Sequence, residues 1–146
     1  MKQILFSTDS NWTGLILRLV LGFIMLPHGA QKLFGAFGGS GFSATMNYFT
    51  QTMKIPFAIS LLIIFVEFFG SLALIAGLSS KLWAILFINI MTGAITTTCY
   101  PNGFFMNWFG NQQGEGYEYH LLIIGICIAL IVTGSGAFSV DRLLMK

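Results

Sequence analysis

The sequence predicts an all-α membrane protein built as a bundle of four transmembrane helices. Of its 146 residues, 55% are hydrophobic and only 8% are charged, whereas soluble domains carry about 25% charged residues. A hydrocarbon layer of roughly 30 Å needs about 20 apolar residues at about 1.5 Å rise per residue. Runs of this kind cover residues 12–33, 57–78, 82–99 and 117–133. Transmembrane strands would alternate between apolar and polar residues, and these runs do not.

The first run, residues 12–33, is expected to remain as a helix and not to be removed as a secretory leader. Asp9 interrupts the basic start, the apolar stretch is too long for a leader, and no A-x-A-like cleavage site follows. Pro27 lacks a backbone N–H and is expected to kink this helix near His28. Such a kink would open a pocket there.

The second run, residues 57–78, carries a single carboxylate, Glu67, near its centre. A carboxylate in hydrocarbon normally faces the bundle interior and has a partner, which makes it a candidate functional residue. Gly70, Ser71 and Gly77 are small residues of the kind that allow helices to approach closely in lipid. Since Gly70 and Ser71 share a face with Glu67, the carboxylate is predicted to point at another helix.

The first run offers the partner. At about 100° per residue, one stripe of that helix carries three ionisable side chains and two glycines. These residues are Arg18, Gly22, His28, Gly29 and Lys32. Arg18 is the predicted partner of Glu67, because a guanidinium stays charged and can hold a carboxylate with two hydrogen bonds.

Three interpretations of Glu67 are open. The pair with Arg18 could be a structural ion pair that fixes helix register. Glu67 could be protonated and serve as neutral contact between helices. Alternatively, Glu67 and His28 act as catalytic groups, with Arg18 and Lys32 as ligand-binding groups, in a pocket that opens to the outside.

The third run, residues 82–99, contains Asn89, which is expected to hydrogen-bond to a neighbouring helix. Cys99 lies near the outer end of this run and Cys127 lies about 15 Å deep in the fourth. A disulfide requires Cα atoms within about 7 Å, so the two cysteines are not expected to be bridged.

The fourth run begins at a cluster of polar residues. Glu118 and His120, with Glu115 just before them, are predicted ligand-binding residues at the outer entrance. Alternatively, the two acidic residues complement the helix dipole. No metal site is predicted, because Glu118 and His120 are two residues apart and point to different faces. Before them lie Phe104, Phe105, Trp108 and Phe109, an expected interfacial aromatic belt or, alternatively, the entrance for a planar quinone.

The lysines and arginines predict the orientation. If four helices place both termini on one side, that side holds Lys2, Arg18, Lys81, Arg142 and Lys146, and the other holds Lys32 and Lys54. Both termini of this single domain, residues 1–146, are therefore predicted to be cytoplasmic. The net charge of +2 is dispersed, so nucleic acid is not an expected partner.

At these residues the sequence resembles the DoxX family of small four-helix bacterial membrane proteins. The resemblance rests on the order and spacing of short pieces along nearly the whole chain. They are Arg18-Leu-Val-Leu-Gly22, His28-Gly29 with Lys32, Glu67-Phe-Phe-Gly70, Gly77-Leu78, Gly114-Glu115, Gly134-Ser-Gly136 and Ser139-Val-Asp141.

The resemblance implies a location in the bacterial inner membrane and a link to quinone chemistry. The family takes its name from a subunit of an archaeal thiosulfate:quinone oxidoreductase, and several bacterial members carry an oxidoreductase label. The chain has no flavin or nucleotide fingerprint, so a quinone or a partner enzyme would supply the redox chemistry. The alternatives are a non-catalytic membrane anchor of a redox enzyme and, ranked last, a small-molecule or ion pathway that would need a homo-oligomer.

Overall fold

The computed structural model describes residues 8–145, and these form an all-helical bundle without strands. Three segments are long and apolar enough to cross a membrane: Trp12–Phe34, Phe57–Ala76 and Ser80–Asn102. A further apolar helix, Glu118–Thr133, has 16 residues. The all-α prediction is confirmed, whereas the fourth predicted span is shorter than the roughly 20 residues that a bilayer requires.

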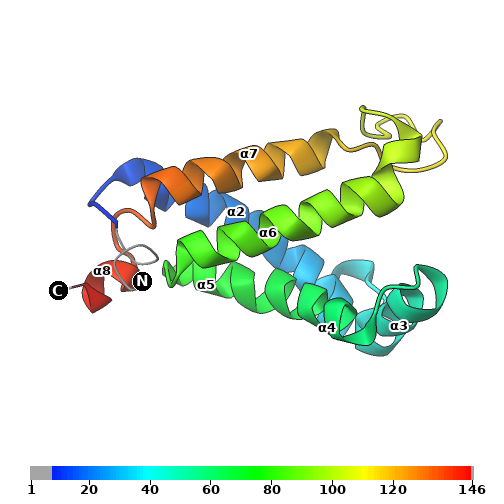
Figure 1. Cartoon of the computed structure of the whole chain (residues 1–146), viewed down its shortest axis with the longest axis horizontal. Coiled ribbons are helices and arrows are strands. Elements are labelled where there is room, and N and C mark those ends of the chain that lie inside the picture. The colour runs from blue at the N-terminus through cyan, green and yellow to red at the C-terminus, as the bar shows by residue number, and fades with distance from the viewer. Residues whose placement is uncertain (1–7, 146) are drawn as a thin grey trace.

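The long helices lie side by side and reverse direction at each end of the molecule (Figure 1). The elements are α2 (Trp12–Phe34), η1 (Ala36–Gly38), α3 (Gly41–Asn47), η2 (Tyr48–Thr52), α4 (Phe57–Phe65), η3 (Val66–Gly70), α5 (Ser71–Ala76), α6 (Ser80–Ala94), η4 (Ile95–Cys99), η5 (Tyr100–Asn102), α7 (Glu118–Thr133) and α8 (Val140–Leu144). α2 continues through Pro27 without an interruption in its helical assignment. Of the lysines used to predict orientation, Lys2 and Lys146 lie outside the described residues.

The segment between the first two long helices, which none of the predicted apolar runs covers, is mostly helical. α3 and the π-helical turn η2 fill most of residues 41–52. Gly35 and Gly41 both have positive φ angles and serve as turn positions at helix ends, so they bound the short helices and do not prevent them.

Close contact between α2 and the second long helix sets their register. A Cβ atom on Gly29 would lie 2.6 Å from the carbonyl carbon of Glu67, so only glycine fits there. Further along, Gly22 packs in the same way against Ser71 and Ile75. Glu67 is thereby level with Gly29, inside the π-helical turn η3. Small residues that let backbones touch are the usual basis of helix packing in lipid.

Arg18 holds one end of the bundle together. Its side chain is 1% exposed and donates hydrogen bonds only to backbone carbonyls. The acceptors are Leu74 (3.2 Å) and Ile75 in the last turn of α5, and Ser135 (2.9 Å), Ala137 (3.0 Å) and Phe138 (2.9 Å) after the end of α7. A helix end leaves its last carbonyls without partners and carries partial negative charge. Arg18 therefore satisfies the end of α5 and ties it to the loop that follows α7, where lipid offers no other donor.

Asp141 stabilises the same end of the bundle as Arg18. It is 1% exposed, and its carboxylate accepts hydrogen bonds from the Ser79 and Ser80 amides, at 2.6 and 3.3 Å, and from the Ser135 hydroxyl. The Ser79 and Ser80 amides lie at the start of α6, where the helix dipole favours a negative charge. Asp141 thus caps α6, and the Ser139 hydroxyl donates to the Gly136 carbonyl.

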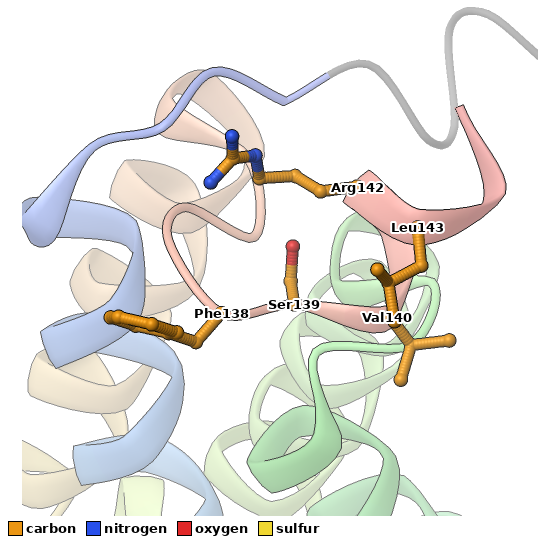
Figure 2. Close-up of a pocket in the computed structure, with 5 residues that line it drawn as sticks. All are labelled: Phe138, Ser139, Val140, Arg142 and Leu143. Carbon is orange, nitrogen blue, oxygen red and sulfur yellow. The ribbon is translucent and has the colours of Figure 1, made fainter. Parts of the chain in front are cut away.

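The surface of this end is formed by α8 and the loop before it (Figure 2). The Phe138 ring packs edge-on against Trp12, with ring centroids 5.9 Å apart. Arg142 points away from α8 toward the segment that precedes α2, where it donates to the Ser10 hydroxyl at 2.9 Å. The shallow pocket among these residues, about 360 Å³, is lined by a single ionisable side chain, Arg142, and is not the candidate site.

Replacing Arg18 is expected to destabilise the fold strongly. Arg18→Gln removes the charged donor from five backbone carbonyls and the positive charge that interacts with buried Asp141, so the free energy of unfolding should fall by about 3–5 kcal/mol. The matched control is Arg142→Gln, which removes a partly exposed arginine at the same end and should cost less than about 1 kcal/mol. Thermal unfolding of both variants in detergent compares them, and equal losses would contradict the role assigned to Arg18.

Candidate functional site

A cavity of about 670 Å³ occupies the end of the bundle opposite Arg18. This volume falls in the range of small-molecule sites, about 300–1,000 Å³. Most of its wall is apolar, with side chains from α2, α4, α6, α7 and the segment around η2. The polar side chains that line it are His28, Lys32, Tyr48, Glu67, Asn89, Thr97, Thr98, Glu115, Tyr119 and His120. An apolar cavity with a few convergent polar groups is the usual form of a binding site.

Glu67 and Lys32 form an ion pair at the wall of this cavity. Lys32 Nζ lies 2.5 Å from Glu67 Oε2, and the two side chains are 26% and 5% exposed. Lys32 stands one turn after Gly29, where the close contact of the two helices brings Glu67 level with it. The buried carboxylate is thereby compensated, while part of the ammonium stays accessible from the cavity.

The predicted ion pair between Arg18 and Glu67 is wrong. Gly29, which is level with Glu67, lies eleven residues after Arg18, or about 16 Å along the helix axis. That distance exceeds the reach of an arginine side chain. The sequence analysis placed Glu67 midway between the helix ends, but the contacts at Gly22 and Gly29 shift its helix so that Glu67 lies beside Lys32.

His28 lies at the same level of the cavity as this ion pair. Its ring centroid is 6.1 Å from that of Tyr119 on α7, and the Tyr119 hydroxyl donates to Met25 Sδ at 3.6 Å. His120, the next residue, lies with its Nε2 atom 3.8 Å from Cys99 Sγ. The cavity thus gathers His28 and Lys32 from α2, Glu67 from η3, and Tyr119 and His120 from α7.

Glu118 does not line this cavity, although it was a predicted ligand-binding residue. Its carboxylate accepts a hydrogen bond from the Met106 amide at 3.2 Å, and Glu115 accepts one from the Asn107 amide at 2.8 Å. Both acids therefore hold the loop that precedes α7, and neither caps α7 with its side chain.

Asn89 has a different place from the one expected. Its side chain donates to the Ile85 carbonyl of its own helix at 2.8 Å, and the exposed residue lines the cavity without joining a neighbouring helix. A polar side chain in the middle of an apolar run made Glu67 a candidate functional residue, and the same argument could have placed Asn89 at the cavity as well. Cys99 had no such pattern, since its contact with His120 depends on how α6 and α7 pack.

Within residues 8–145, no three His, Cys, Asp or Glu side chains converge closely enough to hold a metal ion. The two cysteines, Cys99 and Cys127, are both buried and free.

Comparison with known proteins identifies the family. The family model described as DoxX matches residues 13–100, which is more than half of the chain. The chain belongs to the DoxX family. The matched residues extend from α2 to η5 and include Arg18, His28, Lys32 and Glu67.

Two curated relatives cover almost the whole chain. The chain is 28% identical over 132 residues to "Putative oxidoreductase CatD" of Bacillus subtilis (strain 168), covering 90% of this chain and 87% of the relative. It is 27% identical over 132 residues to "Inner membrane protein YqjF" of Escherichia coli (strain K12), covering 90% of this chain and 92% of the relative. No solved structure matches the chain.

The Lys32 and Glu67 pair predicts non-additive effects of mutation. Lys32→Gln and Glu67→Gln should each lower the free energy of unfolding, and the double variant should lose less than the sum, with a coupling of about 1–3 kcal/mol. The control cycle pairs Glu67→Gln with Arg18→Gln, whose losses should add. Thermal unfolding in detergent measures both cycles, and coupling only in the Arg18 cycle would contradict the pairing.

Proposed function

We propose that this DoxX protein is the quinone-linked membrane subunit of an oxidoreductase. The cavity beside the Lys32 and Glu67 ion pair is the observation that supports this function most directly. A quinone combines a planar ring, two carbonyl oxygens and an apolar tail. The apolar wall of the cavity suits the ring and the tail, and its polar side chains can hydrogen-bond to the carbonyl oxygens.

The shape of the bundle supports entry from the bilayer. α5 and α6 meet at the end that holds Arg18, whereas α4 runs apart from α6 toward the other end (Figure 1). The cavity lies there, with Ile59 and Leu62 from α4 and Leu86 and Gly93 from α6 in its wall. Ile59 and Leu62 are about half exposed, so this wall faces lipid. A lipid-soluble ligand fits this opening better than a water-soluble one.

The ion pair and His28 supply the chemistry that a quinone needs from a protein. Reducing a quinone to a quinol takes two electrons and two protons. Lys32 can donate a hydrogen bond to a quinone oxygen, and Glu67 and His28 can exchange protons with it. The electrons would come from a partner enzyme, as the chain carries no flavin or nucleotide fingerprint.

We further propose that α7 completes a four-helix, multi-pass protein of the bacterial inner membrane. The name of the Escherichia coli relative supports this location. Arg18, Lys81 and Arg142 lie toward the end where α8 packs, and Lys32 and Lys54 lie toward the other. Cytoplasmic loops of membrane proteins carry an excess of lysine and arginine. The end with α8 is therefore cytoplasmic, and the cavity lies in the outer half of the bilayer.

A role as a non-catalytic partner in a complex is the second candidate. It is favoured by the loop before α7, where Trp108 is 78% and Phe109 is 89% exposed. Exposed aromatic side chains are common at protein interfaces and at the membrane surface. Purification from native membranes with a bound redox enzyme, lost on Trp108→Ser with Phe109→Ser, would support this candidate over a chain that acts alone.

Quinone binding tests the first proposal. The protein in lipid nanodiscs should bind decylubiquinone, and Glu67→Gln or Lys32→Gln should weaken binding about 10–100-fold, the value of a lost hydrogen bond to a charged group. The control is Lys54→Gln, which removes an exposed lysine that does not line the cavity. Isothermal titration calorimetry measures the affinities, and absence of binding to the unaltered protein would falsify the proposal.

Filling the cavity should have the same effect without touching its polar groups. Gly93 lines the cavity, and a Cβ added there meets nothing within 4 Å, so Gly93→Leu should fold normally and weaken quinone binding about tenfold or more. Gly125→Leu is the matched control, because Gly125 has equally open space but lies outside the cavity. Equal quinone affinities of the two variants would place the ligand elsewhere.

A further inference from the structure

Cys99 and His120 form a thiol and imidazole pair in the wall of the cavity. Cys99 is the last residue of η4, and His120 lies in the first turn of α7, so the packing of these two helical segments brings them together. The distance of 3.8 Å between Sγ and Nε2 fits a weak hydrogen bond from a thiol to a ring nitrogen.

The two cysteines of the chain differ in what surrounds them. Cys99 is 5% exposed and lines the cavity, whereas Cys127 is fully buried in the hydrophobic core among Phe87, Ile123 and Leu130. A ligand in the cavity could therefore reach the Cys99 sulfur, while Cys127 is enclosed by protein. Cys127 therefore serves as an internal control for the reactivity of the Cys99 thiol.

The other nitrogen of His120 is not used. Nδ1 is enclosed and has no hydrogen-bond partner among the described residues. A histidine that only stabilises the fold commonly satisfies both nitrogens, since buried polar atoms are costly when unpaired. His120 makes its one hydrogen bond to the thiol, which is the arrangement in which an imidazole takes a proton from a cysteine nucleophile.

We infer that Cys99, assisted by His120, captures quinones that carry an unsubstituted ring carbon as covalent thioethers in this cavity. The inference rests on the proposed quinone site and adds a reaction to it. Sγ bonds to the free ring carbon, and the electron pair of the ring double bond moves to the conjugated carbonyl oxygen. The thiol proton passes through His120 Nε2 to that oxygen.

The product follows without any further reagent. The hydrogen on the attacked ring carbon leaves as a proton and reaches the second carbonyl oxygen, which restores an aromatic ring. The adduct is a hydroquinone thioether with the summed mass of the protein and one quinone. The addition is redox-neutral overall, because both carbonyls become hydroxyls while the attacked carbon exchanges its bond to hydrogen for a bond to sulfur, so no outside electrons are needed. A quinone with every ring carbon substituted has no such hydrogen to lose, so it binds reversibly.

Labelling with menadione, which has one free ring carbon on its quinone ring, tests the inference. The protein in nanodiscs should gain the mass of one menadione, and peptide mapping should place it on Cys99. Cys99→Ser should abolish labelling, Cys127→Ser should leave its rate unchanged, and His120→Gln should slow it at least tenfold, since a positioned general base contributes about 10²–10⁴-fold.

Either of two results from the labelling rates would overturn the inference. One is labelling of Cys127 as fast as that of Cys99, and the other is an unchanged rate in His120→Gln. Reversible binding of decylubiquinone to Cys99→Ser separates this inference from the proposed function. If the unaltered protein binds decylubiquinone but menadione does not label Cys99, only the thioether is rejected. If the unaltered protein does not bind decylubiquinone, the quinone site itself is rejected.

Discussion

The interaction on which the rest of the structure depends is the placement of the Arg18 guanidinium among five backbone carbonyls. A membrane offers no water to the end of α5 or to the loop after α7, so the free carbonyls of both need a donor from within the protein. One guanidinium supplies it to both segments, and its positive charge suits the negative end of the α5 helix dipole. Asp141 completes the arrangement at the positive end of α6.

Arg18 and Asp141 hold one end of the bundle together, and the cavity lies at the opposite end. The second long helix is pressed against α2 at Gly22 and Gly29, and beyond that contact α4 and α6 move apart around the cavity (Figure 1). The Lys32 and Glu67 pair lies where the two regions meet. The bundle thus has two separate sets of charged residues. Arg18 and Asp141 stabilise the fold, and Lys32 and Glu67 lie beside the cavity.

The sequence was sufficient for much of this structure. The apolar runs predicted the long helices to within a few residues, and the cost of a carboxylate in hydrocarbon correctly singled out Glu67 as a buried group with a partner. The identity of that partner was not predictable, because register depends on which glycines touch a facing backbone, and periodicity does not reveal this. The contact between Cys99 and His120 was hidden for the same reason, as it arises only when α6 packs on α7.

We propose that the ligand lies at the Glu67 end of the bundle and that Arg18 serves only the fold. Photolabelling with an azidoquinone, followed by mass spectrometry of the peptides, measures the position of the ligand directly. Labels are expected on residues from α4 and α6 that line the cavity, such as Ile59, Leu62 and Ile90, and decylubiquinone should compete with the labelling. Labels concentrated around Arg18, Leu74 and Phe138 would contradict it.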